Sequence, residues 1–501
     1  MIVAPSQSME LSVLLAGMDL VVPDLAVTEI ATDSRDAASG GLFLACSGSE
    51  HHGLEFLDAA LRAGVKAVAW EPADEVQAPE LPATVIGIEI PGLRSKLGII
   101  ADRFFDGPSR SLAVTGITGT NGKTTTAYLV AQALNQLSHR AGYMGTLGFG
   151  FPGELQPSAL TTPGCITVHR RLREMANAGA DNVVAEVSSH ALAQQRVDGV
   201  RFRVTALTNV SRDHLDYHGN MQSYAEAKAR LFAGAETQTA VINVGDKYGV
   251  KLAGQLNPAT DLISVALVNT GSDFPGARLV GRLTGARADG LGLQLSGDFG
   301  EGLLESPLWG RFNAENLAMA TGILLALGIS LRDAIQALAN SNTPPGRMER
   351  IQSGDGQPTV VVDFAHTPDA LGKALEAVRD HSSGQVWCVF GCGGDRDRGK
   401  RGSMGAIASS LADFSIVTDD NPRNEDPQQI IADIVAGIDH KEGIQIVPDR
   451  KKAIDIAIQS AATNDVVLIA GKGHESVQIV GEHKHCFSDS QAARSSLGGA
   501  G

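Results

Sequence analysis

The stretch SLAVTGITGTNGKTTTAYLVAQALNQL, residues 111–137, combines a strand, a glycine-rich turn and a helix. Its first residues form a short apolar run typical of a strand, and its last residues place apolar side chains at helical spacing. The turn between them ends in Lys123 and Thr124 at the expected helix start. Such a turn cradles a nucleotide phosphate chain, because backbone N–H groups there face the phosphates. We therefore expect Lys123 to contact phosphate and the Thr124 hydroxyl to ligate Mg²⁺.

The glycines of this turn depart by one residue from the commonest phosphate-loop pattern. G-x-x-x-x-G-K-[ST] requires glycine at position 117, where the chain has Ile117. Gly116 and Gly119 precede Gly122 instead. The alternative is a glycine-rich strand–helix turn that binds no ligand. The preceding strand, the following helix and the three spaced glycines together favour phosphate binding.

The composition predicts an acidic, soluble protein with several domains. A chain of 501 residues is long for one core, and about three domains are expected. The net charge of −15 argues against non-specific nucleic-acid binding, so anionic ligands require local basic clusters. The apolar run LSVLLAGMDLVV lacks a basic leader, and no apolar stretch is long enough to span a bilayer. We expect a cytoplasmic protein without membrane insertion.

The cysteines are few and scattered, at Cys46, Cys165, Cys388, Cys392 and Cys486. None forms a C-x-x-C pair, and no second pair of cysteines lies near Cys388 and Cys392 to complete a zinc site. Buried or incidental thiols in a reducing compartment are the expected state.

Residues 1–110 are expected to form a small α/β domain. The short strands GLFLAC and KAVAW flank the helical segment EFLDAALRAG. The loop before the first strand holds Ser34 and Arg35, which can bind a phosphate or a base edge. From these residues alone, a capped turn is the favoured alternative.

Residues 111–343 continue the phosphate-loop domain, and two of their strands end in polar side chains. Glu186 lies in the apolar run NVVAEV, where a carboxylate is costly unless it pairs with a cation. Mg²⁺ is the expected partner, and a structural salt bridge is the alternative. Asp213 and His214 follow the strand VTALTNV, at the strand end where ligands collect in open α/β sheets. A zinc site is disfavoured there, because no cysteine or third histidine lies at ligand spacing.

Residues 344–501 are expected to form a doubly wound parallel sheet, because strands and helices alternate cleanly. The sequence PPGR ends the preceding helix and places Arg347 at the domain junction. Ligands commonly bind between domains. Three later strands deliver Arg396, Arg423 and Glu475 to one edge of the sheet, which predicts a ligand site there.

The ordered set of short motifs along the whole chain resembles the Mur ligases. The motifs are TGTNGKTT, TTPG, EVSSHAL, TNVSRDHLDYHG, AKARLF, GRFNAEN, PPGRMER, DFAHTPDAL, GCGGDRDRGKR, DNPR and GKGHE. The resemblance implies an N-terminal α/β uridine-nucleotide domain, a central mostly parallel P-loop-type ATPase domain and a C-terminal Rossmann-like amino-acid domain. It also implies ATP-driven amide formation in peptidoglycan precursor synthesis. ATP would phosphorylate the D-Glu side chain of UDP-MurNAc-L-Ala-D-Glu, and an amine would attack the acyl phosphate.

The same resemblance assigns the ATP and metal sites. The ATP contacts it implies are Gly116, Thr118, Gly119, Thr120, Asn121, Gly122, Lys123, Thr124, Thr125, Asn313, Arg347, Asp363 and His366. The Mg²⁺ ligands it implies are Thr124, Glu186, His214 and Lys228, the last as N6-carboxylysine formed with CO₂. Lys123, Lys228 and His214 are its catalytic residues. By itself, Lys228 would be taken for a solvated surface lysine, and Asn313 and Asn316 for helix caps or neighbours on one face.

Two further residue sets follow from the resemblance. The UDP-MurNAc-dipeptide would be held by Ser34, Thr161, Thr162, Ser188, Gln194 and Arg196. The amino acid, meso-2,6-diaminopimelate, would be held by Arg396, Asp420, Asn421, Pro422, Arg423, Gly471 and Glu475. Diaminopimelate differs from lysine by a second carboxylate, which requires an arginine, and Arg423 is in place for it. The sequence leaves the stereoisomer open.

Two alternatives compete with this interpretation. A folylpolyglutamate synthase-like ligase would share the phosphate loop and the linker arginine, but it would not be expected to carry DNPR together with GKGHE. A nucleotide-dependent switch would hydrolyse ATP without forming an amide.

We expect a monomer that acts on small molecules.

Overall fold

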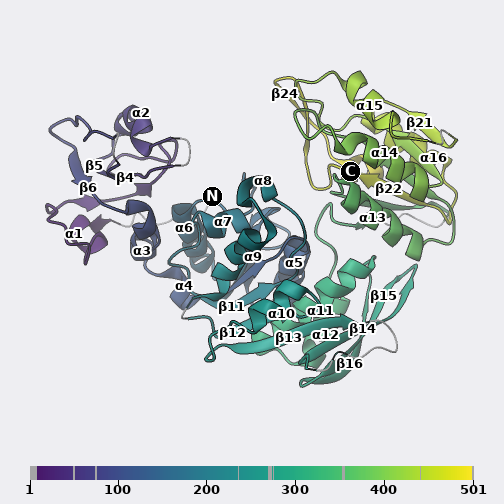
Figure 1. Cartoon of the computed structure of the whole chain (residues 1–501), viewed down its shortest axis with the longest axis horizontal. Coiled ribbons are helices and arrows are strands. Elements are labelled where there is room, and N and C mark those ends of the chain that lie inside the picture. The colour runs from purple at the N-terminus through teal and green to yellow at the C-terminus, as the bar shows by residue number, and fades with distance from the viewer. Residues whose placement is uncertain are drawn as a thin grey trace. The chain divides into compact units, whose positions relative to one another are not determined.

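Figure 1 shows the computed structural model. The structure divides into two compact units. It describes residues 8–48, 51–73, 76–234, 236–268, 274, 276–351, 356–439 and 442–498. The first unit comprises residues 1–123 and 134–262, and the second comprises residues 124–133 and 263–501. Across the described ranges, no helix combines the length and the apolar character needed to cross a membrane.

The N-terminal part of the first unit is a small parallel sheet with helices. Its strands follow the order β3-β4-β5-β6. Their bounds are β3 (Ile30–Ala31), β4 (Leu42–Ala45), β5 (Ala67–Trp70) and β6 (Ile86–Glu89). The short elements before and around them are β1 (Met9–Glu10), β2 (Ala26–Val27), α1 (Leu11–Leu14), η1 (Gly53–Phe56), α2 (Leu57–Arg62), α3 (Leu93–Phe104) and α4 (Pro108–Ser111). The strands predicted from GLFLAC and KAVAW are β4 and β5.

The rest of the first unit is built around the phosphate-loop strand. Its strands follow the order β12-β11-β7-β10-β8-β9, in which β9 is antiparallel to β8 and the other pairs are parallel. Glu186 lies opposite Ile117 and Leu207 opposite Thr118, so three strands end at one edge. The strands are β7 (Ala113–Thr118), β8 (Ala141–Gly145), β9 (Gly148–Gly150), β10 (Asn182–Glu186), β11 (Phe202–Leu207) and β12 (Thr239–Asn243).

Helices follow most of these strands. They are α5 (Lys123–Gln136), α6 (Cys165–Asn177), α7 (Ser189–Ala193), α8 (Leu215–His218), α9 (Met221–Ala229), η2 (Arg230–Phe232) and α10 (Lys247–Ala253). Apolar side chains of α6 and α9 pack with the β7, β10 and β11 strands in one core cluster. The middle of α5, residues 124–133, groups with the second unit.

The second unit begins with strands and two helices. β13 is parallel to β14, while β14, β15 and β16 form an antiparallel meander. The elements are β13 (Asp261–Val268), β14 (Leu279–Arg287), β15 (Gly290–Gly297), β16 (Gly300–Ser306), α11 (Arg311–Ala326) and α12 (Leu331–Ala339).

The C-terminal part of the second unit is a six-stranded sheet in the order β17-β18-β22-β19-β20-β21. β17 is antiparallel to β18, and the other pairs are parallel, as predicted. The strands are β17 (Glu349–Ile351), β18 (Thr359–Asp363), β19 (Val386–Phe390), β20 (Phe414–Val417), β21 (Ile444–Ile446) and β22 (Val466–Ala470). The remaining elements are α13 (Pro368–His381), α14 (Lys400–Leu411), α15 (Pro427–Val435), α16 (Arg450–Ser460), α17 (Asp489–Ser496) and the hairpin β23 (Val477–Val480) with β24 (His483–Cys486).

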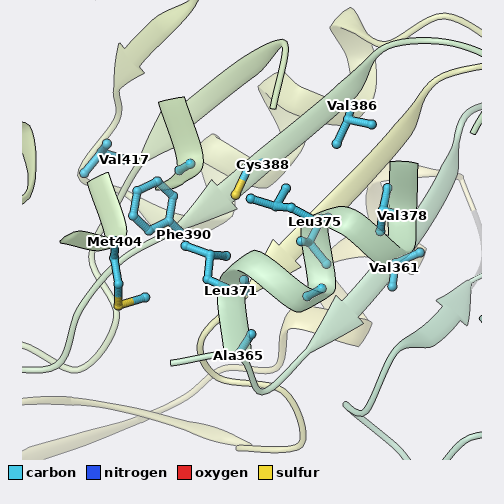
Figure 2. Close-up of a cluster of buried hydrophobic side chains, with 14 of the residues drawn as sticks. Val361, Ala365, Leu371, Leu375, Val378, Val386, Cys388, Phe390, Met404 and Val417 are labelled. Atoms are coloured by element: carbon cyan, nitrogen blue, oxygen red, sulfur yellow. The ribbon is translucent and has the colours of Figure 1, made fainter. Parts of the chain in front are cut away.

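One face of this sheet is covered by α13 and α14. Leu371 and Leu375 of α13 lie beside Cys388 and Phe390 of β19 in a buried apolar cluster (Figure 2). Burial raises the pKa of the Cys388 thiol to about 12, so the thiol stays protonated. The five cysteines are all free thiols. This agrees with the prediction of buried or incidental cysteines.

Three element ends differ from the sequence prediction. α14 begins at Lys400, earlier than its apolar spacing indicated, because a turn in which Asp397 accepts from the Gly399 amide leads directly into it. β11 ends at Leu207, because the next side chain, Thr208, turns toward the phosphate loop. β7 continues to Thr118 and so contains Gly116.

Candidate active site

The phosphate loop joins β7 to α5 through two glycines with left-handed backbone. Gly119 has φ 151° and Gly122 has φ 83°, and a Cβ at Gly119 would lie 1.9 Å from Thr208 Oγ1. Only glycine meets both demands at position 119. Gly116 has a different role, because it lies inside β7 against the ring of Phe202. Of the three spaced glycines, Gly116 thus serves packing, while Gly119 and Gly122 form the loop.

The end of β11 anchors the loop. Thr208 Oγ1 donates to the Asn121 carbonyl at 2.6 Å, and Asn209 Oδ1 accepts from the Asn121 amide at 2.9 Å. Thr120 Oγ1 lies 3.1 Å from the hydroxyl of Tyr224 on α9. These contacts fix the loop before any ligand binds. Thr118, Thr124 and Thr125 are buried at its base.

Lys123 and Lys228 meet at one backbone carbonyl. Each Nζ donates to the Gly119 carbonyl at 2.8 Å. Lys228 is only 1% exposed, so the prediction of a solvated surface lysine from sequence alone is wrong. Its pKa is lowered well below the ordinary value, chiefly by desolvation and then by the Lys123 charge. The protonated form is therefore less favourable at Lys228 than at an exposed lysine.

His214 lies in an aromatic cluster that includes Tyr224, whose ring Lys228 also contacts. It has a left-handed backbone with φ 50°, and its ring centroid is 6.3 Å from that of Tyr224 and 4.8 Å from that of His190. Lys228 Nζ lies 4.4 Å from the Tyr224 ring centroid. Tyr224 therefore links the phosphate loop, His214 and Lys228. No sequence motif pointed to this tyrosine.

Glu186 is held at the end of β10 by hydrogen-bond donors. Its side chain accepts a short hydrogen bond from the Tyr143 hydroxyl, and it accepts from the Thr146 amide at 2.9 Å and from Thr146 Oγ1 at 3.2 Å. It is 1% exposed. These donors satisfy the oxygens of a buried side chain. Tyr143 and Thr146 are site residues that sequence reasoning missed.

The donor types here suit Mg²⁺. Mg²⁺ prefers oxygen ligands and usually combines one or two carboxylates with substrate phosphates. Glu186 supplies a carboxylate and Thr124 a hydroxyl, while His214 adds a nitrogen. Among the described residues, no group of three or more His, Cys, Asp or Glu side chains could hold a metal without such help. The residues fit a metal that binds together with nucleotide.

Five of the six residues expected for the UDP-MurNAc-dipeptide belong to one hydrogen-bonded network. Thr162 Oγ1 donates to the Glu186 carbonyl at 2.8 Å and accepts from the Ser188 amide at 3.1 Å. Arg196 donates to the Thr162 carbonyl at 2.9 Å and to Gln194 Oε1 at 2.6 Å. Thr161, in the same network, has its Oγ1 3.1 Å from Thr146 Oγ1. The network surrounds the end of β10.

Ser34 lies apart from that network, in the turn after β3. Asp33 accepts from the backbone amide of Arg35 at 2.9 Å and pairs with its side chain. This is the capped turn that the residues alone favoured. The structure gives Ser34 no contact with the other predicted residues.

In the second unit, Asn313 and Asn316 share one face of α11. Asn316 Nδ2 donates to Asn313 Oδ1 at 2.9 Å, and Asn313 Nδ2 donates to the Trp309 carbonyl at 2.7 Å. The cap position of the helix belongs to Gly310, so neither asparagine caps it. Thr126 of α5 donates to Asn316 Oδ1 at 3.4 Å. The expected shared face is confirmed.

Three other predicted ATP residues gather around Phe364. The Arg347 guanidinium lies 4.6 Å from the Phe364 ring centroid, and the His366 ring also lies 4.6 Å from it. Asp363 accepts from the Met348 amide at 2.8 Å, and burial raises the pKa of its carboxyl. Phe364 sits in the DFAH motif, but its role as a platform was not predicted.

The DNPR and GKGHE loops meet at the carboxyl edge of the six-stranded sheet. Asn421 Nδ2 donates to Glu475 Oε2 at 2.8 Å. Arg423 has φ 53°, and its guanidinium donates to the Gly394 carbonyl at 2.6 Å. Asp420 is buried, and a Cβ at Gly471 would lie 2.5 Å from its Oδ2. The loops that carry Arg396, Arg423 and Glu475 were predicted to converge at this edge. Most of the residues expected in these loops do lie together there.

A buried arginine that was not predicted from the sequence supports these loops. Arg401 is 0% exposed and pairs with Glu425 at 2.9 Å and with Asp433 at 2.9 Å. Glu425 in turn accepts from the Asp395 amide at 2.6 Å, next to Arg396. Arg396 itself extends from this loop and donates to the preceding carbonyl at 3.2 Å. Arg401 thus ties the GCGGDR loop to the DNPR loop.

Family models match three successive parts of the chain. The descriptions are "Mur ligase family, catalytic domain" for residues 26–105, "Mur ligase middle domain" for residues 117–324 and "Mur ligase, glutamate ligase domain" for residues 346–473. The three-domain α/β fold expected from the resemblance is confirmed. Its exact boundaries stay predictions.

Individual proteins match over almost the whole chain. The UDP-N-acetylmuramoyl-L-alanyl-D-glutamate–2,6-diaminopimelate ligase of Alkalilimnicola ehrlichii is 47% identical over 482 residues, which are 95% of each chain. A solved structure of a ligase with the same name is 34% identical, has a TM-score of 0.72, and covers 98% of this chain and 99% of its own. Folylpolyglutamate synthase of Mycobacterium tuberculosis, complexed with ADP, shares the fold alone, with 20% identity, a TM-score of 0.60, and 75% of this chain and 91% of its own covered. The protein therefore belongs to the Mur ligase family.

Proposed function

We propose that the protein is an ATP-dependent ligase that joins 2,6-diaminopimelate to UDP-MurNAc-L-Ala-D-Glu in peptidoglycan precursor synthesis. The observation that carries the proposal is the convergence of Arg423, Asn421 and Glu475 in one protein with the phosphate loop. Relatives that carry this name span 95% of the chain. Folylpolyglutamate synthases share the fold, but they are not expected to carry the DNPR and GKGHE loops together.

The reaction must activate a carboxylate, because hydroxide is a poor leaving group. ATP transfers its γ-phosphoryl group to the D-Glu side chain and leaves ADP. The amine of diaminopimelate then attacks the acyl phosphate, and phosphate departs with the electrons of the broken C–O bond. Lys123 is placed to neutralise charge on the phosphates, since its ammonium already lies over the loop. The site must also hold three anionic groups in reacting geometry, and such positioning lowers the barrier.

Lys228 is proposed to react with CO₂ and become a carbamate. A neutral amine is the reacting form, and desolvation together with Lys123 favours that form. The product would exchange a buried amine for an anionic oxygen ligand beside Lys123 and His214. When bound, Mg²⁺ would neutralise phosphate charge, held by Thr124, Glu186, His214 and the modified Lys228.

The two organic substrates are proposed to bind to separate sets of residues. The Thr162, Ser188 and Arg196 network would orient the muramoyl-dipeptide. Arg423 would bind the distal carboxylate of diaminopimelate, and Glu475 its distal ammonium. Asn313, Arg347 and the Phe364 platform would hold the adenosine part of ATP. We also propose that the enzyme acts as a cytoplasmic monomer.

The direct test is the dependence of phosphate release on both substrates. Purified protein with ATP and Mg²⁺ should release phosphate only when UDP-MurNAc-L-Ala-D-Glu and diaminopimelate are both present. Mass spectrometry should find the amide product. Equal release with ATP alone would favour a nucleotide-dependent switch. Release that requires glutamate and a folate instead would favour the folylpolyglutamate alternative.

A further inference from the structure

A buried lysine lies beneath the loops that bind the amino acid. Lys472 follows β22 in the GKGHE motif, and its side chain is 0% exposed. Burial of an ammonium is costly unless every proton finds an acceptor. Its Nζ donates to Asn421 Oδ1 at 3.1 Å, to Glu475 Oε2 at 3.2 Å and to the Val477 carbonyl at 2.7 Å. The three protons therefore meet three acceptors, one in the DNPR loop and two in the segment that follows Lys472.

These acceptors also contact one another, so the arrangement is closed. Asn421 Nδ2 donates to the same Glu475 oxygen, Oε2, at 2.8 Å. Asn421 Oδ1 accepts from the Ile479 amide at 2.9 Å as well as from Lys472. Glu475 is 33% exposed, so its carboxylate remains open to a ligand. Lys472 thus orients the Glu475 carboxylate through Oε2, while its own side chain is not exposed.

The same contacts extend to Arg423 through the strand β23. Lys472 and Asn421 hold this strand at Val477 and Ile479. The Arg423 amide donates to the Ile479 carbonyl at 3.0 Å, and the Arg423 carbonyl accepts from the Gly481 amide at 2.7 Å. These bonds clamp a residue whose φ of 53° is unfavourable for arginine. One buried ammonium therefore supports both expected recognition groups.

We propose that Lys472 is a positioning and specificity-determining residue, which holds Glu475 and Arg423 in the geometry that selects an amino acid with an ammonium and a carboxylate at its distal end. The inference rests on the proposed function and deepens it. Lys472 touches neither substrate nor nucleotide; it acts through Asn421, Glu475 and β23. A compact ammonium with three acceptors in fixed directions is suited to this role.

The test is a double-mutant cycle on steady-state kinetics. Lys472→Met keeps the length of the side chain and removes the charge. We expect it to raise KM for diaminopimelate about tenfold to a hundredfold, the effect of losing hydrogen bonds to a charged group. KM for ATP and KM for UDP-MurNAc-L-Ala-D-Glu should change less than about twofold. Adding Glu475→Gln to Lys472→Met should raise KM much less than the product of the two single effects.

A merely structural role predicts different results. In that case kcat would fall and all three KM values would shift together, or the effects of the two substitutions on KM would multiply. Either outcome overturns the proposal. Lys451→Met is the matched control, because that lysine is 56% exposed and pairs only within its helix in the described structure. If Lys472→Met does not fold, Lys472→Gln retains a donor and should show a smaller rise in the same KM. An unchanged KM in a folded variant would contradict the proposal.

The wild-type assay separates this proposal from the proposed function. If wild-type protein does not use diaminopimelate, the function itself is wrong. If wild-type protein uses diaminopimelate and Lys472→Met uses it equally well, only the role of Lys472 is wrong. Discrimination against lysine provides a second readout, since loss of the clamp on Arg423 should narrow the preference for diaminopimelate.

Discussion

At the scale of single residues, the chemistry depends on cations whose surroundings set their state. Lys123 and Lys228 share the Gly119 carbonyl, yet the two are not equivalent. Lys228 is buried, and a second positive charge nearby makes its protonated form expensive. A sequence motif could point to this lysine, but its burial and its neighbour become visible only in the fold.

Lys228→Met should make the protein more stable and inactive. The folded-state pKa of Lys228 is lowered, so the unfolded chain binds an extra proton between that pKa and about 10.4. Lysine therefore destabilises the fold at neutral pH, and this cost fades as the pH rises toward 10.4. In CO₂-free buffer we expect Tm to rise by about 2 °C or more at pH 7, and by less at pH 10. The kcat should fall about 10²-fold to 10³-fold.

Scanning calorimetry and a phosphate-release assay measure both effects. Lys251→Met is a suitable control, because Lys251 lies on the nearby α10 and its contact is to Gln222 at the surface. A Lys228→Met protein that keeps its activity would contradict the assigned role. A Tm that falls at neutral pH would contradict the lowered pKa.

Arg423→Ala should weaken the use of diaminopimelate selectively. Loss of a charge-assisted contact costs about 1.5–3 kcal/mol, so kcat/KM for diaminopimelate should fall about tenfold to a hundredfold. KM for ATP should stay unchanged. Arg398→Ala is the control, since Arg398 is exposed and pairs with Asp433 at 3.1 Å. Equal kinetics for the variant and the wild type would remove Arg423 from the specificity pocket.

At the scale of elements, strand ends and the turns after them build the site. The phosphate loop depends on Gly119, whose φ of 151° and contact with Thr208 leave no room for a side chain. The six-stranded sheet depends on a buried pair below its edge. Arg450 of α16 donates to Asp489 of α17 at 2.7 Å, and it also donates to the Ala470 carbonyl at 3.0 Å.

Gly119→Ala should weaken nucleotide binding strongly while the protein stays folded. A Cβ would displace Thr208 and the loop end that it anchors, so KM for ATP should rise about a hundredfold. Gly285→Ala is the control, because nothing lies within 4 Å of a Cβ there and its φ is not left-handed. Fluorescent ATP-analogue titration gives the affinity, and circular dichroism monitors folding. Unchanged affinity would show that the loop geometry tolerates a side chain.

Arg450→Met should destabilise the C-terminal part of the molecule. Both side chains of the Arg450–Asp489 pair are 0% exposed, so the variant leaves a buried carboxylate without its partner. Removal of one partner of such a pair costs about 3–5 kcal/mol. The double variant Arg450→Met with Asp489→Leu should recover much of the lost stability. Urea unfolding measures the free energy of unfolding of each variant. A double variant less stable than Arg450→Met would contradict the prediction.

The sequence predicted the elements well and the side-chain networks poorly. Periodicity and turn residues located β7, α5 and most of the alternating C-terminal elements. They could not locate the start of α14, because its first turn, KRGS, contains no apolar side chain. Tyr224, Phe364, Arg401 and Lys472 were missed, since each acts through contacts between segments far apart in the chain.

At the scale of the whole molecule, an acidic protein must bind anionic substrates. The net charge is −15, yet the lysines and arginines of the sites concentrate positive charge at strand ends. The division into two compact units also differs from the three domains of the family. Residues 124–133 group with the second unit, because Thr126 and Gln132 bond to Asn316 and to the Asn342 carbonyl. The helix that begins at the phosphate loop thus belongs to both units.

The most direct test of the account is a substrate panel with one purified protein. ATP, Mg²⁺ and UDP-MurNAc-L-Ala-D-Glu are held constant, and product is measured with diaminopimelate or with lysine. The account predicts amide product with diaminopimelate and at least about tenfold lower kcat/KM with lysine, because only diaminopimelate offers a distal carboxylate to Arg423. Equal use of both amino acids, or a preference for lysine, would contradict it.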